Sequence, residues 1–128
     1  GEIPPQRPNT AVITKSVDGV SAASDRLNSK LQSVLFDRLQ FVEREELEVL
    51  WDEQKLGMSG LLDEQTIATA GKIQGVAYIL FLKVKSIDAE KHLFEAKLVS
   101  VEDGGVVWFL YSEGSVKEIE EYLSSLNS

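Results

Sequence analysis

Residues 76–84 have the sequence VAYILFLKV, and this stretch decides the fold of the chain. Only Lys83 interrupts the apolar run, so a strand formed here would be apolar on both faces. A continuous apolar run of this length, rich in branched and aromatic side chains, is typical of a strand in the middle of a sheet. We therefore expect 76–84 to be the central strand, and Gly75 to end a preceding helix in the left-handed conformation.

Downstream of this strand, the pattern predicts a hairpin and a closing helix. Residues 92–101 and 106–111 have the composition of strands, and the turn signal Asp103-Gly104-Gly105 lies between them. The apolar positions of a final amphipathic helix follow at helical spacing: Val116, Ile119, Leu123 and Leu126, with Tyr122 at the edge of this apolar face. The last three strands should form an antiparallel meander.

Upstream, residues 10–14 (TAVIT) are a β-branched run that fits a buried strand. A helix follows, with an apolar stripe made of Ala23, Leu27, Leu31, Val34, Leu35 and Leu39. Residues 41–42 are then a very short strand. Two more helices are expected at about 44–55 and 63–73, the second capped by Asp63, with a glycine-containing loop between them.

The expected order of elements is β-α-β-α-α-β-β-β-α, which defines a single α/β (α+β) domain with helices packed on a mixed sheet. Strands joined by helices should be parallel neighbours, so the early strands are expected to be parallel. The domain is expected to span residues 10–128. Residues 1–9 hold all three prolines and almost no apolar side chains, so we expect an extended tether there.

Composition excludes several functional classes. The chain has 21 acidic and 13 basic residues, a net charge of -8, and no cluster of Lys or Arg, which argues against binding to nucleic acid or to an anionic membrane. It has no cysteine, which excludes disulfides, thiolate nucleophiles and cysteine-ligated zinc. No signal peptide or long apolar span is visible. Either the protein is cytosolic, or this is a mature chain whose targeting segment was removed; the absence of an initiating Met favours the second.

The most acidic stretch is residues 41–64, FVEREELEVLWDEQKLGMSGLLDE, and its carboxylates do not form a recognisable chemical site. A carboxylate-bridged metal pair needs Glu-x-x-His motifs on facing helices, and the only histidine of the chain, His92, lies near the hairpin. A solvated helix face is the favoured interpretation. Glu53 and Gln54 are expected to hold the amides of the following glycine loop, and Arg44 to pair with a nearby carboxylate.

Other candidate motifs also favour structural roles. Gly71-Lys72 resembles the end of a phosphate-binding loop, but the pattern lacks its first glycine and its hydroxyl residue, and it falls inside an expected helix. We expect Gly71 to allow a close helix approach. His92 has no neighbouring nucleophile to activate, so a surface histidine is favoured over a catalytic base. We therefore expect no catalytic residue, no metal and no cofactor.

The run Trp108-Phe109-Leu110-Tyr111 would be apolar on both faces of a strand, because side chains alternate. Either helices cover both faces of the sheet, or one face awaits a partner. Coverage of both faces is the favoured alternative, since the closing helix must pack somewhere. The other alternative makes Phe109 and Tyr111 a partner surface.

Residues in the middle and at the end of the chain match the pattern of one protein family. They are Phe41-Val42-Glu43-Arg44, Leu47, Leu50, Glu53-Gln54, Leu56, Ser59-Gly60-Leu61, Asp63, Thr66, Ala68, Gly71-Lys72, Gly75-Val76, Tyr78-Ile79, Leu98-Val99-Ser100-Val101 and Gly105-Val106-Val107-Trp108. Over about residues 10–112 the chain thus resembles the curli-assembly lipoprotein (CsgG-type) family. The residues expected to form its structural motif are Glu43, Arg44, Glu53, Gln54, Ser59, Gly60, Gly71 and Gly75.

The resemblance implies a non-enzymatic fold similar to the N-terminal domain of TolB and to lipoprotein activators of penicillin-binding proteins. It implies a periplasmic domain, tethered in many members to the outer membrane through a lipidated N-terminal cysteine. The curli secretion channel also carries long membrane-inserting hairpins, and this sequence has no insertion long enough for them. The expected function is therefore binding to, or assembly with, a protein partner of the cell envelope, including self-association. The alternatives are a ring-forming secretion component and a regulator of a peptidoglycan synthase.

Overall fold

The computed structural model describes residues 7–16, 21–42 and 75–126. Its elements in chain order are β1 (Asn9–Ser16), α1 (Ser21–Leu35), β2 (Gln40–Val42), β3 (Tyr78–Ser86), β4 (His92–Ser100), β5 (Val106–Gly114) and α4 (Val116–Ser125). Every predicted element in these ranges is present. The helices expected at 44–55 and 63–73 lie outside the described residues.

The five strands form one mixed sheet with the order β2-β1-β3-β4-β5. Strand β1 pairs in parallel with β2 and β3, and β4 pairs antiparallel with both β3 and β5. The parallel pairs require crossover connections, whereas short turns suffice between the antiparallel strands. The prediction of a mixed α+β sheet with β3 at its centre is confirmed.

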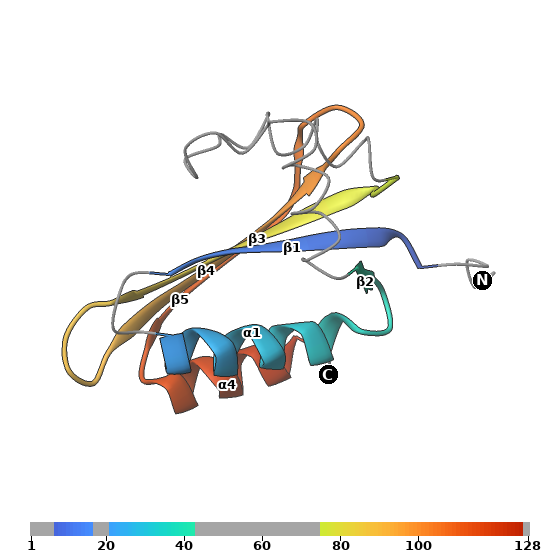
Figure 1. Cartoon of the computed structure of the whole chain (residues 1–128). Coiled ribbons are helices and arrows are strands. Elements are labelled where there is room, and N and C mark those ends of the chain that lie inside the picture. The colour runs from blue at the N-terminus through green and yellow to red at the C-terminus, as the bar shows by residue number, and fades with distance from the viewer. Residues whose placement is uncertain (1–6, 17–20, 43–74, 127–128) are drawn as a thin grey trace.

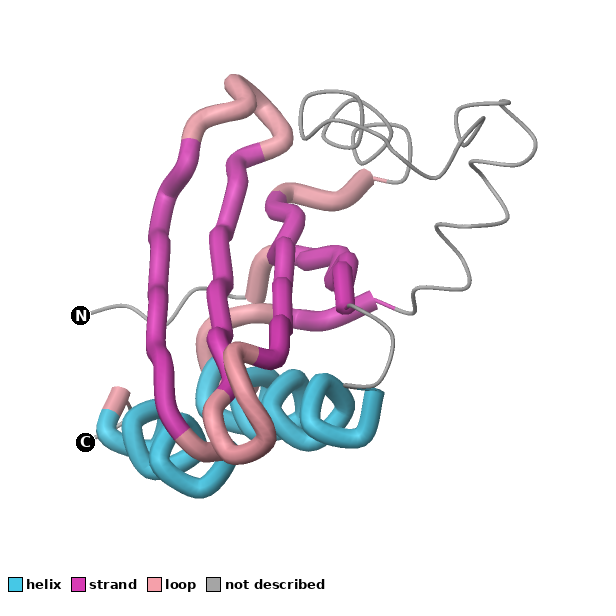
Figure 2. The backbone as a smooth tube through the Cα atoms, turned by 90° about the vertical axis from the view of Figure 1, so that its left-hand side faces the viewer, coloured by secondary structure: helices cyan, strands magenta, loops and turns pink. Residues whose placement is uncertain are grey.

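Helices α1 and α4 lie side by side on the same face of this sheet (Figure 1). In the view turned by 90° about the vertical axis, α4 lies below β5 and α1 lies below β3 (Figure 2). Alternate residues of the strands meet the apolar stripes of the helices in one core, which includes Leu80, Leu82, Val84, Phe94, Ala96, Leu27, Leu31, Ile119 and Leu123. Burial of these side chains holds both helices against the sheet.

A smaller apolar cluster occupies part of the opposite face. It consists of Ala11, Ile13, Val76, Ile79 and Val101, all of them buried, and Phe81 packs against it partly exposed. These residues belong to β1, to β3 and to the segments just before β3 and just after β4. On the opposite face, the apolar side chains of β1 and of the start of β3 are therefore largely shielded from solvent.

The residues just before β1 contact the segment that follows α1. Strand β1 begins at Asn9, and the carbonyl of Pro8 accepts a hydrogen bond of 2.9 Å from the amide of Gln40. The guanidinium of Arg7 lies 4.6 Å from the ring centre of Phe36 and also donates to the carbonyl of Phe36. Because residues 1–6 lie outside the description, the tether itself stays a prediction.

Two glycines have the backbone conformation that the sequence pattern indicates. Gly104 has φ +75° in the turn between β4 and β5, where the Asp103 carboxylate accepts a 2.8 Å hydrogen bond from the amide of Gly105. Gly75 has φ +74°, which is the left-handed conformation that we expected for this residue. Whether Gly75 ends a helix concerns residues outside the described ranges.

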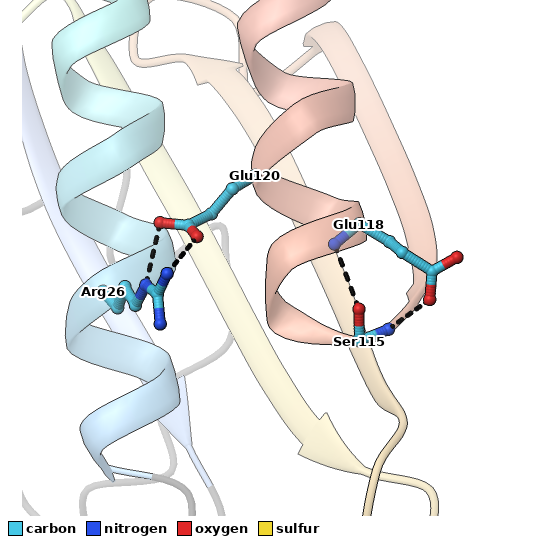
Figure 3. A network of polar contacts seen from close by, with 4 residues as sticks. All are labelled: Arg26, Ser115, Glu118 and Glu120. Atoms are coloured by element: carbon cyan, nitrogen blue, oxygen red, sulfur yellow. Dashed lines mark hydrogen bonds and ion pairs between the residues drawn. The ribbon is translucent and has the colours of Figure 1, made fainter.

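Polar contacts fix the start of α4 and join it to α1 (Figure 3). The Ser115 hydroxyl accepts from the amide of Glu118 at 3.1 Å, and the amide of Ser115 donates to the Glu118 carboxylate at 3.0 Å. This is a complete capping box. The guanidinium of Arg26 on α1 forms an ion pair of 2.7 Å with Glu120 on α4.

Candidate partner-binding surface

The residues expected to form the structural motif lie mostly outside the described part of the chain. This applies to Glu43, Arg44, Glu53, Gln54, Ser59, Gly60 and Gly71, whose roles stay predictions. Gly75 lies in the turn that leads into β3. Phe109 and Tyr111, the partner surface of the alternative interpretation, lie on β5.

Strand β5 separates apolar side chains onto two different faces. Leu110 points toward the helices and is 4% exposed, and Trp108 packs partly buried against the same core. Phe109 and Tyr111 point to the face without α1 and α4, where they are 52% and 47% exposed. Among the described residues no helix covers this side of β5, and the helices expected at 44–55 and 63–73 lie outside the described ranges, so coverage of both faces stays a prediction. The sheet is closed on the β1 and β3 side of this face and open at β5.

Charged residues surround the two exposed aromatic rings. Phe109 lies opposite Lys97 and Tyr111 lies opposite Glu95 in the antiparallel register with β4. Glu113, which follows Tyr111 by two positions on the same strand, accepts a hydrogen bond from the Tyr111 hydroxyl. This bond, together with burial and the charges of Glu113 and Glu95, raises the pKa of Tyr111 above its ordinary value of 10.0. The bond to Glu113 orients the Tyr111 hydroxyl along the strand.

Sequence reasoning missed part of this surface. Val106 and Val107, which open β5, are both exposed, and a register shift between Leu98 and Val99 accounts for the extra residue there. Tyr122 on α4 is 42% exposed. The sequence hints at the exposure of Tyr122 only through its position at the edge of the apolar face of the helix. The bulge at the start of β5 has no recognisable pattern in the sequence.

No comparable chemical site is found among the described residues. In those ranges no three His, Asp or Glu side chains gather as metal ligands do, and no helix is long and apolar enough to cross a membrane. An open hollow of about 450 Å³ lies where β3 begins and β4 ends, lined by residues 75–78 and 100–102. Among the described residues of that lining, Glu102 is the one carboxylate and there is no imidazole.

His92 is half-buried at the start of β4, between Ser86 of β3 and Gly114 of β5. Its Nδ1 atom is shielded from solvent and has no hydrogen-bond partner among the described residues. The neighbouring hydroxyl, Ser86, donates instead to the carbonyl of Asp88 at 3.0 Å. This arrangement lacks the hydrogen bond between base and nucleophile that acyl-transfer chemistry requires.

Several solved bacterial protein structures share this fold. The C-terminal domain of LpoB from Salmonella enterica is similar with a TM-score of 0.66 and 13% identity, covering 84% of this chain and 82% of that one. Lipoprotein GNA1162 from Neisseria meningitidis gives 0.61 and 14%, covering 84% and 80%. TolB from Acinetobacter baumannii gives 0.59 and 13%, covering 97% of this chain and 27% of TolB.

Residues 7–92 match the family of the curli production assembly/transport component CsgG. The match covers more than half of the chain, so the chain belongs to this family. No curated protein gave a match. The resemblance inferred from residues 10–112 is thereby confirmed, as is the relationship to the LpoB and TolB folds.

Proposed function

We propose that this chain is a domain of the bacterial cell envelope that binds another protein through the exposed side of β5. The single observation that carries the proposal is the pair Phe109 and Tyr111, about half exposed on a strand at the edge of the sheet. Exposed aromatic side chains that lie together mark interaction sites more often than single exposed apolar residues do. Neither ring is needed to close the core on the helix face.

The family and the structural neighbours support an envelope location for this binding. The family is named for an assembly and transport component, and one neighbour is named as a lipoprotein. We place the domain in the periplasm, with attachment to the outer membrane of the kind that the family resemblance implies. Membrane contact would then occur through a lipid anchor and not through the described helices.

The proposed role is non-enzymatic and uses no cofactor. Its alternatives at finer detail are a ring-forming part of a secretion apparatus and a regulator of a peptidoglycan synthase. Light scattering at micromolar concentration separates the first from simple partner binding, because a ring requires stable self-association. A monomer would exclude the ring and leave partner binding in place.

Affinity capture from a bacterial envelope extract tests the proposal. The wild-type chain is compared with Phe109→Ser/Tyr111→Ser and with Ile87→Ser, since Ile87 is also 47% exposed but lies in the turn between β3 and β4. A partner should bind the wild type and Ile87→Ser, and should be lost from the double variant. The interaction is then reproduced with the purified partner. Equal capture by all three chains would overturn the assignment to β5.

A further inference from the structure

We propose that the partner adds one more strand to the sheet: an extended segment of the partner pairs with the open edge of β5. This segment has apolar side chains along its middle and Lys or Arg at its ends. The inference rests on the proposed function, because it states how the β5 surface binds and which chemistry it selects.

The two edges of this sheet differ in length and in protection. Strand β2 at one edge has three residues, whereas β5 at the other has nine. Natural proteins shield long edges with proline, lysine or bulges. Strand β5 (VVWFLYSEG) contains neither proline nor lysine, and its register shift lies at its first residues. Residues 108–114 are therefore a regular strand whose outer backbone groups are unpaired within the described part of the chain.

Aromatic side chains flank this open edge on both faces of the sheet. Phe109 and Tyr111 lie on one face. On the other face, Glu120 of α4 points toward α1, as its ion pair with Arg26 shows (Figure 3). Tyr122 follows two residues later, about 200° further round the helix, and so lies on the side away from α1. Because α4 lies beneath β5, this side faces the open edge.

This arrangement fits a strand better than it fits a helix or a flat surface. The side chains of an added strand alternate between the two faces, so half of them would meet Phe109 and Tyr111 and half would meet Tyr122. Backbone hydrogen bonds to β5 would provide the affinity, and these aromatic contacts would select apolar residues. A helix packed on one face would leave either Tyr122 or the pair on β5 uncovered.

The charges at the edge specify the ends of the added strand. Glu113 and Glu118 lie where β5 ends and α4 begins, and Glu102 and Asp103 lie in the turn where β5 starts. All four are exposed, and with Lys117 as the one base in the stretch 113–118, both ends of the edge carry a net negative charge. Basic residues at the ends of the partner segment would meet these carboxylates, and the attraction should weaken with salt.

The same charges disfavour a second copy of this chain as the occupant. Antiparallel pairing of two β5 strands would bring Glu113 of each copy near Glu102 and Asp103 of the other. Parallel pairing would bring the two Glu113 residues together. Like charges opposite one another destabilise a strand pair, and each copy already carries a net charge of -8.

The test is titration of the full chain with a synthetic peptide of the length of β5, with alternating Val and Ile between terminal Lys residues. Two further peptides carry N-methyl groups on alternate residues, one on the odd and the other on the even positions. Each of them has therefore lost the N–H donors along one of its two edges only. One methylated form should bind at least about tenfold more weakly than the other, because several backbone hydrogen bonds are lost. The amides of residues 108–114 should gain protection from hydrogen exchange.

Matched variants separate strand pairing from nonspecific contact. Phe109→Ser/Tyr111→Ser should weaken peptide binding by about tenfold, since two cross-strand aromatic contacts are lost. Glu113→Gln should weaken it by about 1.5- to 5-fold at low salt. Ile87→Ser should leave it unchanged.

Three results would overturn strand addition: equal binding of the two methylated peptides, no binding of the unmethylated one, or self-association of the chain that protects the β5 amides. The proposed function would still hold after any of these results if the wild-type chain captures an envelope partner and the Phe109→Ser/Tyr111→Ser variant does not. Conversely, register-dependent peptide binding without such capture would support strand addition and count against the proposed function.

Discussion

Two neighbouring side chains on β5, Leu110 and Phe109, should differ severalfold in how much their truncation to alanine destabilises the fold. The two residues have similar hydrophobicity, but Leu110 is 4% exposed in the core and Phe109 is 52% exposed on the opposite face. Their difference therefore measures whether the β5 surface is open in solution.

The expected magnitudes follow from burial. Replacing a buried leucine with alanine costs about 2–5 kcal/mol, from lost transfer free energy and from the cavity left behind. Complete burial of a phenylalanine side chain is worth about 1.5–3 kcal/mol, and only half of Phe109 is removed from water, so Phe109→Ala should cost about 1 kcal/mol. With a urea m-value of about 1.5 kcal/mol/M, the midpoint should fall by about 2 M for Leu110→Ala and by about 0.7 M for Phe109→Ala.

Urea unfolding followed by tryptophan fluorescence measures both shifts, and Ile87→Ala provides a control of similar exposure outside β5. The control should shift the midpoint no more than Phe109→Ala does. If Phe109→Ala lowers the midpoint as far as Leu110→Ala, the phenyl ring is covered in solution. The open surface on β5, and the strand addition inferred from it, would then be refuted.

Further predictions concern the capping box and the hydroxyl of Tyr111. Ser115→Ala should lower the free energy of unfolding by about 1 kcal/mol, measured by urea unfolding, because the cap of α4 is lost. The amide of Ser115 lowers the pKa of Glu118 below its ordinary 4.5, so the stabilisation by this carboxylate is complete above pH 4.5 and is lost as pH falls through the folded value. Glu118→Gln should therefore be less stable than wild type at neutral pH, with a difference that shrinks below pH 4.5; a constant difference would contradict this. Glu113→Gln should lower the pKa of Tyr111 toward 10.0, seen in the tyrosinate absorbance titration after subtraction of Tyr111→Phe.

The sequence predicted the strands and helices well where pattern and structure have the same cause. The run at 76–84 is apolar because β3 lies in the middle of the sheet, with buried residues such as Ile79 and Leu80 on both faces. The helical spacing of Ile119 and Leu123 likewise reflects burial of one face of α4. Such local periodicity is what sequence patterns report most reliably.

The open side of β5 could not be predicted in the same way. A strand that is apolar on both faces has the same sequence pattern whether helices cover both faces or a partner covers one. Which face of β5 is covered depends on where α4 packs. This is set by contacts between residues far apart in the sequence, such as the shared core of Leu123 on α4 and Leu27 on α1. The end of β5 was also missed, because Ser112 and Glu113 lack strand composition yet lie opposite Phe94 and Leu93 on β4.

Under the proposed function, the surface of β5 is a better guide to the partner than the structural neighbours are. The LpoB domain and GNA1162 share this fold at 13% and 14% identity, which is enough to keep a pattern of core residues but not a particular surface. Phe109 and Tyr111 contribute little to the core, so other side chains could stand there without loss of the fold. A binding surface of this kind can differ between proteins of one fold, and its own chemistry is therefore the better guide: an unshielded edge, aromatic rings on both faces, and acidic ends.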